Sequence, residues 1–386
     1  MPLTDSIQRT LTPAQGHYFL LGPRGTGKTR WLNQTYPNAL LIDLLHPGQY
    51  REYSARPERL LDLIHNTDGS STVIIDEVQR VPDLLNVIHS LIENNGNLTF
   101  VLTGSSARKL RRQGTNLLGG RAVQRTMHPF LASELGESFN LTSALTIGML
   151  PIVLAAKDPS DTLKSYTGLY ITEEVQTEAM VKNIGSFARF LEIIAYSHGS
   201  ELNLSNIARE TSVSRKAVEG YLEILYDLML AFSIPIFKAR AKRQLVSKDK
   251  FYYFDTGIFL TLRPHGPLDD PGFVGGAALE GLIAQQLRAW IAYTRAEHKL
   301  YYWRTRGGLE VDFIVYGPGT FCAIETKMTS RVRNADLVSL KEFGKDYPEA
   351  KRILLYMGEE HLMIEGIQCL PVDLFLRNLV PEHTIL

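Results

Sequence analysis

Residues 22–29 read Gly-Pro-Arg-Gly-Thr-Gly-Lys-Thr, and this stretch decides the fold of the N-terminal region. It fits the pattern Gly-x-x-x-x-Gly-Lys-Ser/Thr and lies between an apolar stretch at 17–21, which predicts a buried strand, and a helical pattern that begins near Lys28. In that context glycines let backbone amides converge on phosphate oxygens at a helix N-terminus. The alternative is a chance glycine-rich turn. The stretch predicts a P-loop.

The P-loop assigns a role to each of its side chains. Lys28 is expected to reach the β- and γ-phosphates of ATP, and the Thr29 hydroxyl is expected to ligate Mg²⁺. ATP and Mg²⁺ are therefore the ligands that we expect here. The predicted nucleotide-binding residues are Gly22, Pro23, Arg24, Gly25, Thr26, Gly27, Lys28 and Thr29.

A second acidic element follows the apolar stretch 72–76, which ends in Asp76 and is followed by Glu77. Asp76 is expected to hold Mg²⁺ through water, and Glu77 to orient and deprotonate the attacking water. The alternative for Glu77 is a solvated charge at a strand end. The pair predicts hydrolysis of ATP rather than binding alone.

Two further residues have alternative roles. The apolar stretch 98–103 leads into Ser105 and Ser106, and Ser105 is expected either to sense the γ-phosphate or to cap a following helix. Arg121 follows a glycine pair and is either an arginine finger, in cis or from a neighbouring subunit, or an ordinary surface arginine.

Apolar strand patterns alternate with helical patterns throughout the first 130 residues. Another strand is predicted at 39–43, and helices are predicted at 57–66 and 82–95. Such alternation is typical of a parallel sheet covered by helices. Residues 1–130 are therefore predicted to form an α/β domain with a P-loop NTPase parallel sheet.

The order of these motifs resembles an AAA+-type P-loop ATPase family of bacteria and archaea, over nearly the whole chain. The motifs are the P-loop at 22–29, Ile-Ile-Asp-Glu at 74–77, Leu-Thr-Gly-Ser-Ser at 102–106, Leu-Gly-Gly-Arg at 118–121 and His-Pro-Phe at 128–130. Gly-Met-Leu-Pro at 148–151 departs slightly from the family's usual Gly-Gly before Tyr-Pro or Leu-Pro. The resemblance implies a winged-helix region after the ATPase domain, and then a domain resembling the PD-(D/E)xK restriction-endonuclease-like fold.

Residues 131–250 are predicted to be a helical lid and winged-helix region. Strand signals stop between about 131 and 235, and residues 202–226 have a helix-turn-helix pattern. A basic run beside this pattern suggests contact with the DNA backbone, whereas the alternative is a lid or a protein-binding module with solvated lysines. The basic residues are Arg209, Arg215, Lys216, Lys238, Arg240, Lys242, Arg243, Lys248 and Lys250, against one acid, Asp249, within 238–250.

Residues 251–386 are predicted to be an α+β unit with strands at 251–254, 300–304, 309–316 and 320–326. If the last two strands pair across the turn at 317–319, alternation brings Asp312 towards Glu325, with Lys327 beside them. Two such carboxylates can hold Mg²⁺, and Lys327 can position a nucleophile or stabilise charge.

The nuclease-like resemblance implies one more acid, Glu280, on an amphipathic helix over 279–290. Glu280, Asp312, Glu325 and Lys327 match that family's motif residue by residue. The alternative is polar-outward alternation on a half-exposed sheet, which produces the same pattern without any activity.

Composition limits the class of protein and its surroundings. The chain has 386 residues, 41 basic and 41 acidic, so any affinity for DNA must come from a local basic patch. Its two cysteines have no CxxC spacing, and no stretch predicts a signal peptide or a membrane span. We expect a cytoplasmic protein of two or three domains with no membrane partner.

The sequence thus predicts an ATP-hydrolysing AAA+-type protein coupled to DNA binding, and leaves Mg²⁺-dependent DNA cleavage open. One alternative is a nucleotide-dependent regulatory switch that binds DNA or protein without cutting it. Another is a protein-remodelling ATPase with a non-catalytic C-terminal scaffold. The sequence does not decide the oligomeric state.

Overall fold

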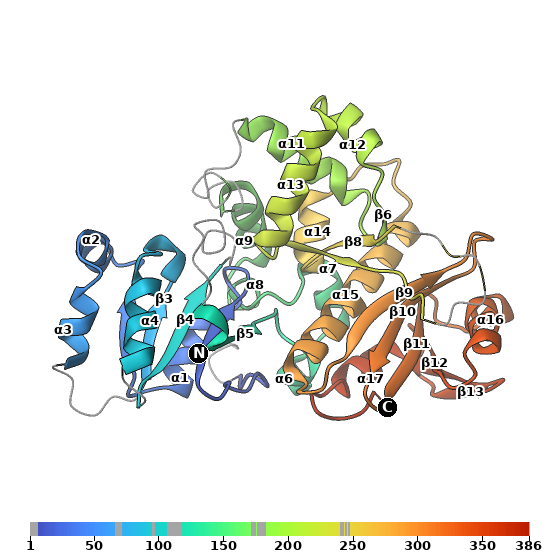
Figure 1. Ribbon diagram of the computed structural model, residues 1–386. Coiled ribbons are helices and arrows are strands. Elements are labelled where there is room, and N and C mark those ends of the chain that lie inside the picture. Colours follow the sequence, from blue (N-terminus) through green and yellow to red (C-terminus); the bar gives the residue numbers. More distant parts are fainter. Residues whose placement is uncertain are drawn as a thin grey trace. The chain divides into compact units, whose positions relative to one another are not determined.

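A computed structural model describes residues 7–65, 72–94, 97–105, 118–170, 183–239 and 248–385, together with Val175, Arg243 and Leu245 (Figure 1). The chain divides into two compact units. The N-terminal unit comprises Leu11–His128 and Tyr226–Leu230. The C-terminal unit comprises Met1–Thr10, Pro129–Leu225 and Ala231–Leu386, so the predicted middle and C-terminal regions belong to one unit.

The N-terminal unit contains a five-stranded parallel sheet in the order β2-β3-β4-β1-β5. Its strands are β1 (His17–Leu21), β2 (Leu40–Asp43), β3 (Thr72–Asp76), β4 (Thr99–Gly104) and β5 (Ala122–Thr126). Its helices are α1 (Lys28–Thr35), α2 (Pro47–Ala55), α3 (Arg59–His65) and α4 (Leu84–Asn94). The predicted α/β class with a parallel sheet is confirmed for this unit.

The order of the strands sets where the loops meet. The central strands β1, β3 and β4 are almost wholly buried, as expected for a parallel sheet that is covered on both faces. Because β4 lies between β1 and β3, the segments that follow these three strands leave the same carboxyl edge of the sheet. Ligands of open α/β sheets bind at this edge.

The first half of the C-terminal unit is mainly helical. It contains α6 (Ala132–Leu135), α7 (Leu141–Ile147), α8 (Pro151–Leu154), α9 (Pro159–Ser165), α11 (Ile184–Ala195), α12 (Leu204–Thr211) and α13 (Arg215–Asp227). Three strands, β6 (Ser200–Glu201), β7 (Ala231–Ile234) and β8 (Lys250–Tyr253), form an antiparallel sheet in the order β6-β8-β7.

The prediction that strand signals stop between about 131 and 235 is wrong at β6 and β7. Helix α13 ends at Asp227, and Met229 has a left-handed backbone with φ of 58°, which a helix does not accommodate. The apolar residues that follow form strand β7 instead. Apolar spacing alone did not distinguish this short buried strand from a further helical turn.

The second half of the C-terminal unit contains a six-stranded mixed sheet in the order β13-β14-β12-β11-β10-β9. The strands are β9 (Lys299–Arg304), β10 (Glu310–Gly317), β11 (Thr320–Lys327), β12 (Lys351–Tyr356), β13 (Leu362–Ile364) and β14 (Ile367–Pro371). The helices are α14 (Thr256–Leu262), α15 (Pro271–Tyr293), α16 (Val338–Asp346) and α17 (Val372–Arg377). The predicted pairing of β10 with β11 is present.

Helix α15 differs from its prediction in length and in surroundings. It begins at Pro271, directly after the capping side chain of Asp270, and it runs to Tyr293. Its second half is buried on nearly all sides rather than amphipathic. Among the described residues, no helix is both long enough and apolar enough to cross a membrane.

Candidate nucleotide site and carboxylate cluster

The P-loop leaves β1 at its carboxyl end and enters α1 directly. At Gly22 a side-chain Cβ would lie 2.4 Å from the Met127 carbonyl oxygen, so only glycine fits there. Gly27 has φ of 90° and forms the N-cap of α1, a left-handed conformation that favours glycine. The backbone of this turn therefore requires glycine at position 22 and favours it at position 27. Arg24 is exposed within the same loop.

Lys28 lies inside the curl of this loop and is only 6% exposed. Its Nζ donates hydrogen bonds to the carbonyl oxygens of Gly22, at 2.7 Å, and Pro23, at 3.2 Å. The Thr26 hydroxyl donates to the same Pro23 carbonyl at 2.8 Å. Carbonyl dipoles hold an ammonium group in place but do not cancel its charge.

Thr29 and Asp76 lie together although they are far apart in sequence. The Thr29 hydroxyl donates to Asp76 Oδ2 at 2.6 Å, and the Thr103 hydroxyl donates to Asp76 Oδ1. Asp76 ends β3 and Thr103 lies near the end of β4, so the strand order itself brings them to one edge. Hydroxyl and carboxylate oxygens are the donors that Mg²⁺ prefers, so these residues fit the expected ion.

Glu77 is the first residue after β3 and has a left-handed backbone with φ of 60°. This uncommon conformation for a non-glycine residue turns the chain sharply, and the Glu77 amide donates to the Thr103 hydroxyl at 3.1 Å. The Glu77 carboxylate accepts a hydrogen bond from Gln79 Nε2 at 2.5 Å. The predicted base is thus fixed at both its backbone and its side chain.

Gln79 is a site residue that sequence reasoning missed. It is 4% exposed, and its Nε2 lies 2.5 Å from Glu77 and 3.2 Å from the Ser105 hydroxyl. Ser105, the predicted sensor, is therefore held in the same group as Glu77. The only sequence signal for Gln79 was its position two residues after Glu77. Ser106 lies outside the described residues.

Arg121 lies next to the end of the sheet opposite the P-loop of its own chain. It directly precedes β5, which runs parallel to β1 and starts beside His17, at the amino end of β1. The P-loop lies at the opposite, carboxyl end. The side chain of Arg121 is 42% exposed and pairs with Glu93 at 2.8 Å. A role at the site of a neighbouring copy stays a prediction.

The comparisons with known proteins divide the chain into three segments. Residues 15–136 match the family model of an AAA domain. The N-terminal unit carries an AAA-type domain. Residues 138–269 and 275–375 match two domains of unknown function, DUF8612 and DUF4143.

Relatives of known sequence cover most of the chain. An uncharacterized protein of Mycobacterium tuberculosis is 27% identical over 92% of this chain and 80% of its own length. An uncharacterized protein of Methanocaldococcus jannaschii is 22% identical over 67% of this chain and 61% of its own. A chain from the structure of C. elegans PCH-2 has a TM-score of 0.21 at 15% identity, covering 54% of this chain and 61% of that one. A TM-score this low does not establish a common fold.

The C-terminal unit brings together several of its predicted acids. Asp312 on β10 lies beside Glu325 on β11, because the pairing of the two strands continues from Phe313 opposite Ile324. Asp312 Oδ2 accepts hydrogen bonds from the Thr326 amide at 2.8 Å and the Thr326 hydroxyl at 2.7 Å. Glu325 Oε1 accepts from Lys327 Nζ at 2.6 Å. The sequence prediction that these residues converge is therefore met.

Lys250, which was not predicted to join them, lies among the same carboxylates. Its Nζ lies 2.9 Å from Glu280 Oε1 and 3.8 Å from Asp312 Oδ1, and it also pairs with Glu310. Tyr252 donates a hydrogen bond to the same Glu280 oxygen at 2.6 Å. We call Lys250, Glu280, Glu310, Asp312 and Glu325 the carboxylate cluster.

Burial dominates the electrostatics of the carboxylate cluster. It raises the pKa of Glu280 to about 7, although Lys250 acts in the opposite direction. Burial, and then the charge of Asp312, raise the pKa of Glu325 well above its ordinary value despite the neighbouring Lys327. Burial therefore favours the protonated form of Glu325, and Glu280 is near its midpoint at neutral pH.

A nuclease-like fold implies Mg²⁺ at the carboxylate cluster, and the geometry argues against that ion. A divalent ion would need Glu280, Asp312 and Glu325 to face one point, and the ammonium of Lys250 lies between the first two. Among the described residues, no group of three or more His, Cys, Asp and Glu side chains is arranged to hold a metal ion. In this arrangement the residues do not fit a divalent ion.

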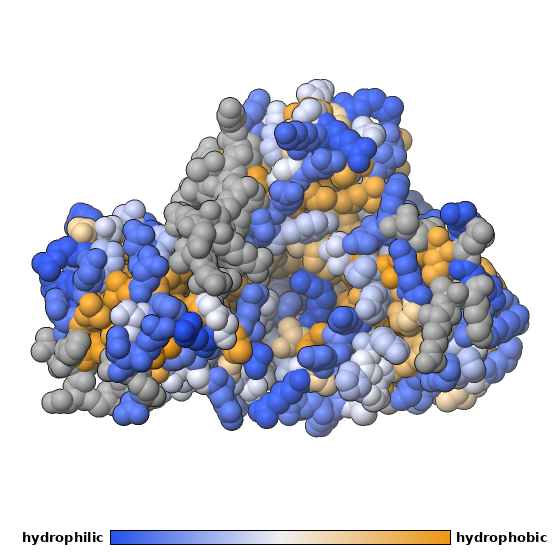
Figure 2. All heavy atoms as spheres, in the orientation of Figure 1, coloured by the Kyte–Doolittle hydropathy of each residue, from blue (hydrophilic) through white to orange (hydrophobic). Residues whose placement is uncertain are grey.

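The helices of the predicted helix-turn-helix are present as α12 and α13. Arg209 contacts the Asn206 side chain, and Arg215 pairs with Glu219 at 3.0 Å, while Lys216 is exposed. Glu219, Glu223 and Asp227 outnumber the two basic residues of α13. Figure 2 shows hydrophilic residues on the outer surface of these helices in that view. Their charge is mixed rather than basic.

The basic run at 238–250 is only partly a basic surface, which corrects its prediction. Lys250 is buried in the carboxylate cluster, and Arg243 pairs with Glu342 at 3.0 Å and Asp346 at 2.7 Å. Lys238 and Lys248 are exposed. Arg240 and Lys242 lie outside the described residues.

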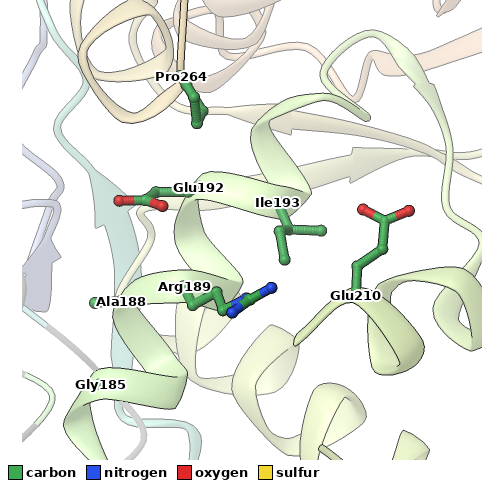
Figure 3. A pocket seen from close by; sticks show the side chains of 7 residues that line it. All are labelled: Gly185, Ala188, Arg189, Glu192, Ile193, Glu210 and Pro264. Atoms are coloured by element: carbon green, nitrogen blue, oxygen red, sulfur yellow. The ribbon is translucent and has the colours of Figure 1, made fainter. Parts of the chain in front are cut away.

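A groove of about 550 Å³ opens beside α11 and α12 (Figure 3). Its charged lining residues are Arg189, Glu192 and Glu210, which makes its formal charge negative. Such a lining does not favour a phosphate or a DNA backbone. The rest of the lining is Gly185, Ala188, Ile193 and Pro264.

Proposed function

We propose that the N-terminal unit binds ATP with Mg²⁺ and hydrolyses it. The observation that carries this proposal is the hydrogen bond of 2.6 Å between Thr29 and Asp76, at the end of a P-loop that encloses Lys28. It joins the P-loop to the acidic end of β3, as a nucleotide site with a metal ion requires. The match of residues 15–136 to an AAA domain supports the proposal.

The residues have distinct roles in this proposal. The ammonium of Lys28 exchanges its carbonyl partners for the β- and γ-phosphate oxygens, while Thr29 and Asp76 hold Mg²⁺, which neutralises phosphate charge when bound. Glu77 accepts a proton from the attacking water. Gln79 keeps the Glu77 carboxylate at the angle that the water requires.

Phosphate release tests the proposal. The wild-type chain should release phosphate from ATP in the presence of Mg²⁺, and Glu77→Gln should slow turnover by about 10²- to 10⁴-fold while it leaves ATP affinity unchanged. Glu58→Gln, which changes an exposed glutamate of the same unit, is the matched control. Equal turnover in Glu77→Gln and Glu58→Gln would remove Glu77 from the role of base.

A second candidate function, binding of double-stranded DNA by the C-terminal unit, is favoured by topology. The order α11, β6, α12, α13, β7, β8, with β8 between β6 and β7, is compatible with the winged helix-turn-helix that we propose for this region. The first turn of α13 presents Arg215 and Lys216, and the β7–β8 connection presents Lys238 and Lys248. Metal-dependent cleavage is not part of the proposal, because Lys250 lies where the ion would bind.

Binding of a DNA duplex at two salt concentrations tests this candidate. Replacing Arg215 and Lys216 together by alanine should weaken binding between about 50 and 200 mM salt. The slope of log affinity against log salt should become shallower by about one unit for each phosphate that the protein no longer neutralises. Lys164→Ala removes an exposed lysine of another helix and is the control.

Stimulation of ATP turnover by a protein client but not by DNA would favour the protein-remodelling alternative.

A further inference from the structure

Lys250 is the cation of the carboxylate cluster, and only 2% of its side chain is exposed. Its place follows from strand alternation, since Lys250 and Tyr252 point to one face of β8 while Phe251 and Tyr253 point to the other. Both Lys250 and Tyr252 contact Glu280. The strand therefore directs an ammonium and a phenol at the same carboxylate.

Three separate elements surround the ammonium group. Glu280 comes from α15, Glu310 and Asp312 from β10, and the ring of Tyr302 on β9 lies 5.4 Å from Nζ. Gly199 also lies close to the Glu280 carboxylate, since a Cβ atom added to this glycine would be 3.3 Å from Glu280 Oε2. The ammonium thus fills the space between the carboxylates rather than lying at their rim.

The charge balance requires a cation at this place. In the described part of the chain, the network around Lys250 contains five carboxylates against three cationic groups. The carboxylates are Glu201, Glu280, Glu310, Asp312 and Glu325, and the cations are Lys250, Arg304 and Lys327. Buried carboxylates without a cation are costly, so the removal of Lys250 leaves an uncompensated negative site.

Lys250 remains charged in these surroundings. Burial alone would lower its pKa, but Glu280, Tyr252, Asp312 and Glu310 together raise the pKa of Lys250 well above its ordinary value. Burial also favours proton uptake on Glu325 and Glu280, because it raises the pKa of both carboxyl groups. The ammonium of Lys250 is the fixed positive charge among these carboxylates.

We propose that the ammonium group of Lys250 is the resident cation of the carboxylate cluster and occupies the place at which a divalent metal ion would bind. It joins the three-stranded sheet to α15 and to the six-stranded sheet through its ion pairs. The cluster of the wild-type chain then holds no divalent ion. This inference concerns the C-terminal unit and does not depend on ATP hydrolysis.

The proposal predicts a gain of function when the ammonium is removed. In Lys250→Met the side-chain length is kept, and Glu280, Glu310 and Asp312 face one another with no cation between them. Carboxylate oxygens in such a group are ligands for Mn²⁺ and Mg²⁺. The variant should bind a divalent ion that the wild-type chain does not.

Mn²⁺ alone, without nucleotide, is the probe. Equilibrium dialysis should find about one Mn²⁺ per chain on Lys250→Met, bound at least about tenfold more tightly than by the wild-type chain. The melting temperature of the variant should rise by about 5 °C with saturating Mn²⁺, because a ligand of the folded state stabilises it by mass action. The wild-type melting temperature should not change. Adding Asp312→Asn to Lys250→Met should remove both gains.

Lys248→Met, two residues earlier and exposed, is the matched control and should behave as the wild type. If Lys250→Met does not fold without metal, Lys250→Met combined with Glu310→Gln removes one carboxylate and is tested in the same way. Recovery of folding by Mn²⁺ supports the proposal. Two results would overturn it: folded Lys250→Met that gains no Mn²⁺, or wild-type chain that binds Mn²⁺ and loses it on Asp312→Asn.

Discussion

Two lysines of the described part of the chain are buried with acidic groups nearby, and their partners differ. In the N-terminal unit, Lys28 donates to the neutral carbonyls of Gly22 and Pro23, while Asp76 accepts from hydroxyl groups. In the C-terminal unit, Lys250 is paired directly with Glu280 and Glu310. The residue types are the same, a lysine and carboxylates, but the carbonyl contacts of Lys28 differ from the carboxylate contacts of Lys250.

The difference teaches how to distinguish a ligand site from a neutralised one. A lysine held by carbonyl dipoles keeps its charge for phosphate oxygens, and a carboxylate held by hydroxyls keeps its charge for a metal ion. A lysine that is ion-paired on several sides has its charge neutralised within the protein. Acidic and basic residues near one another are therefore not enough to predict a metal site.

The largest expected effect lies on the first side of this comparison. Lys28→Ala removes the ammonium that the proposal assigns to the β- and γ-phosphates, and the loss of such charge-assisted hydrogen bonds should weaken ATP binding by about 100-fold or more. Calorimetric titration with ATP and Mg²⁺ measures this, with Lys164→Ala as an exposed control. An ATP affinity within about threefold of the control would show that Lys28 does not bind the phosphates, and the contrast with Lys250 would fail.

Asp255 is a buried acid of the C-terminal unit to which neither proposal assigns a role, and it tests how burial acts on carboxyl groups there. Asp255 accepts hydrogen bonds from the backbone amides of Met149, Gly257 and Ile258, and burial raises the pKa of Asp255 from 3.8 to about 6 although these bonds lower it. The folded chain therefore binds this proton more tightly than the unfolded chain. That stability is complete below the unfolded pKa and is lost as the pH rises through about 6.

Asp255→Asn cannot lose this proton, so the variant should gain stability relative to the wild type as the pH rises. The relative gain between about pH 4 and pH 7.5 should be about 2 kcal/mol, because the full shift corresponds to about 3 kcal/mol at 1.36 kcal/mol for each pKa unit and part of it is already present at pH 4. Urea denaturation of both chains across this range measures it. A difference in unfolding free energy that stays constant with pH would show that burial does not raise this pKa.

A smaller effect is expected at Gln79, which holds the Glu77 carboxylate. Gln79→Leu keeps the volume but removes the donor at 2.5 Å, so turnover should fall by about tenfold, the equivalent of one hydrogen bond. Because Gln79 acts through Glu77, ATP affinity should not change, and the pH profile of turnover should shift. An altered KM with unchanged kcat would instead assign Gln79 to nucleotide binding.

The smallest effect is expected at Arg121, at the opposite end of the sheet from the P-loop. Arg121→Ala breaks an exposed ion pair with Glu93 and should cost at most about 0.5 kcal/mol of unfolding free energy. Turnover of the isolated chain should be unchanged. A large loss of turnover that depends on protein concentration would show that Arg121 acts at the site of a neighbouring copy.

The N-terminal site was largely predictable because its signals are local. The P-loop is one continuous stretch, and Asp76 and Thr103 end strands whose apolar patterns are clear, so a parallel sheet brings them to one edge. Gln79 was missed because its contacts depend on the left-handed turn at Glu77, and no residue pattern in the sequence predicts that turn.

The carboxylate cluster was only half predictable. Strand alternation placed Asp312 beside Glu325, but Lys250 looked like one member of an exposed basic run. Its burial depends on α15 and β10, which lie later in the chain. The residues next to Lys250 in the sequence therefore do not indicate that it is buried. The same limit applies to Arg243, whose partners Glu342 and Asp346 lie on α16, far along the chain.

Binding of Mn²⁺ to the wild-type chain, with and without a non-hydrolysable ATP analogue, tests the central claim most directly. The account predicts about one Mn²⁺ per chain only when the analogue is present, and none in Lys28→Ala, because the nucleotide site is the one place among the described residues that accepts a divalent ion. Mn²⁺ that binds without the analogue and persists in Lys28→Ala would contradict it.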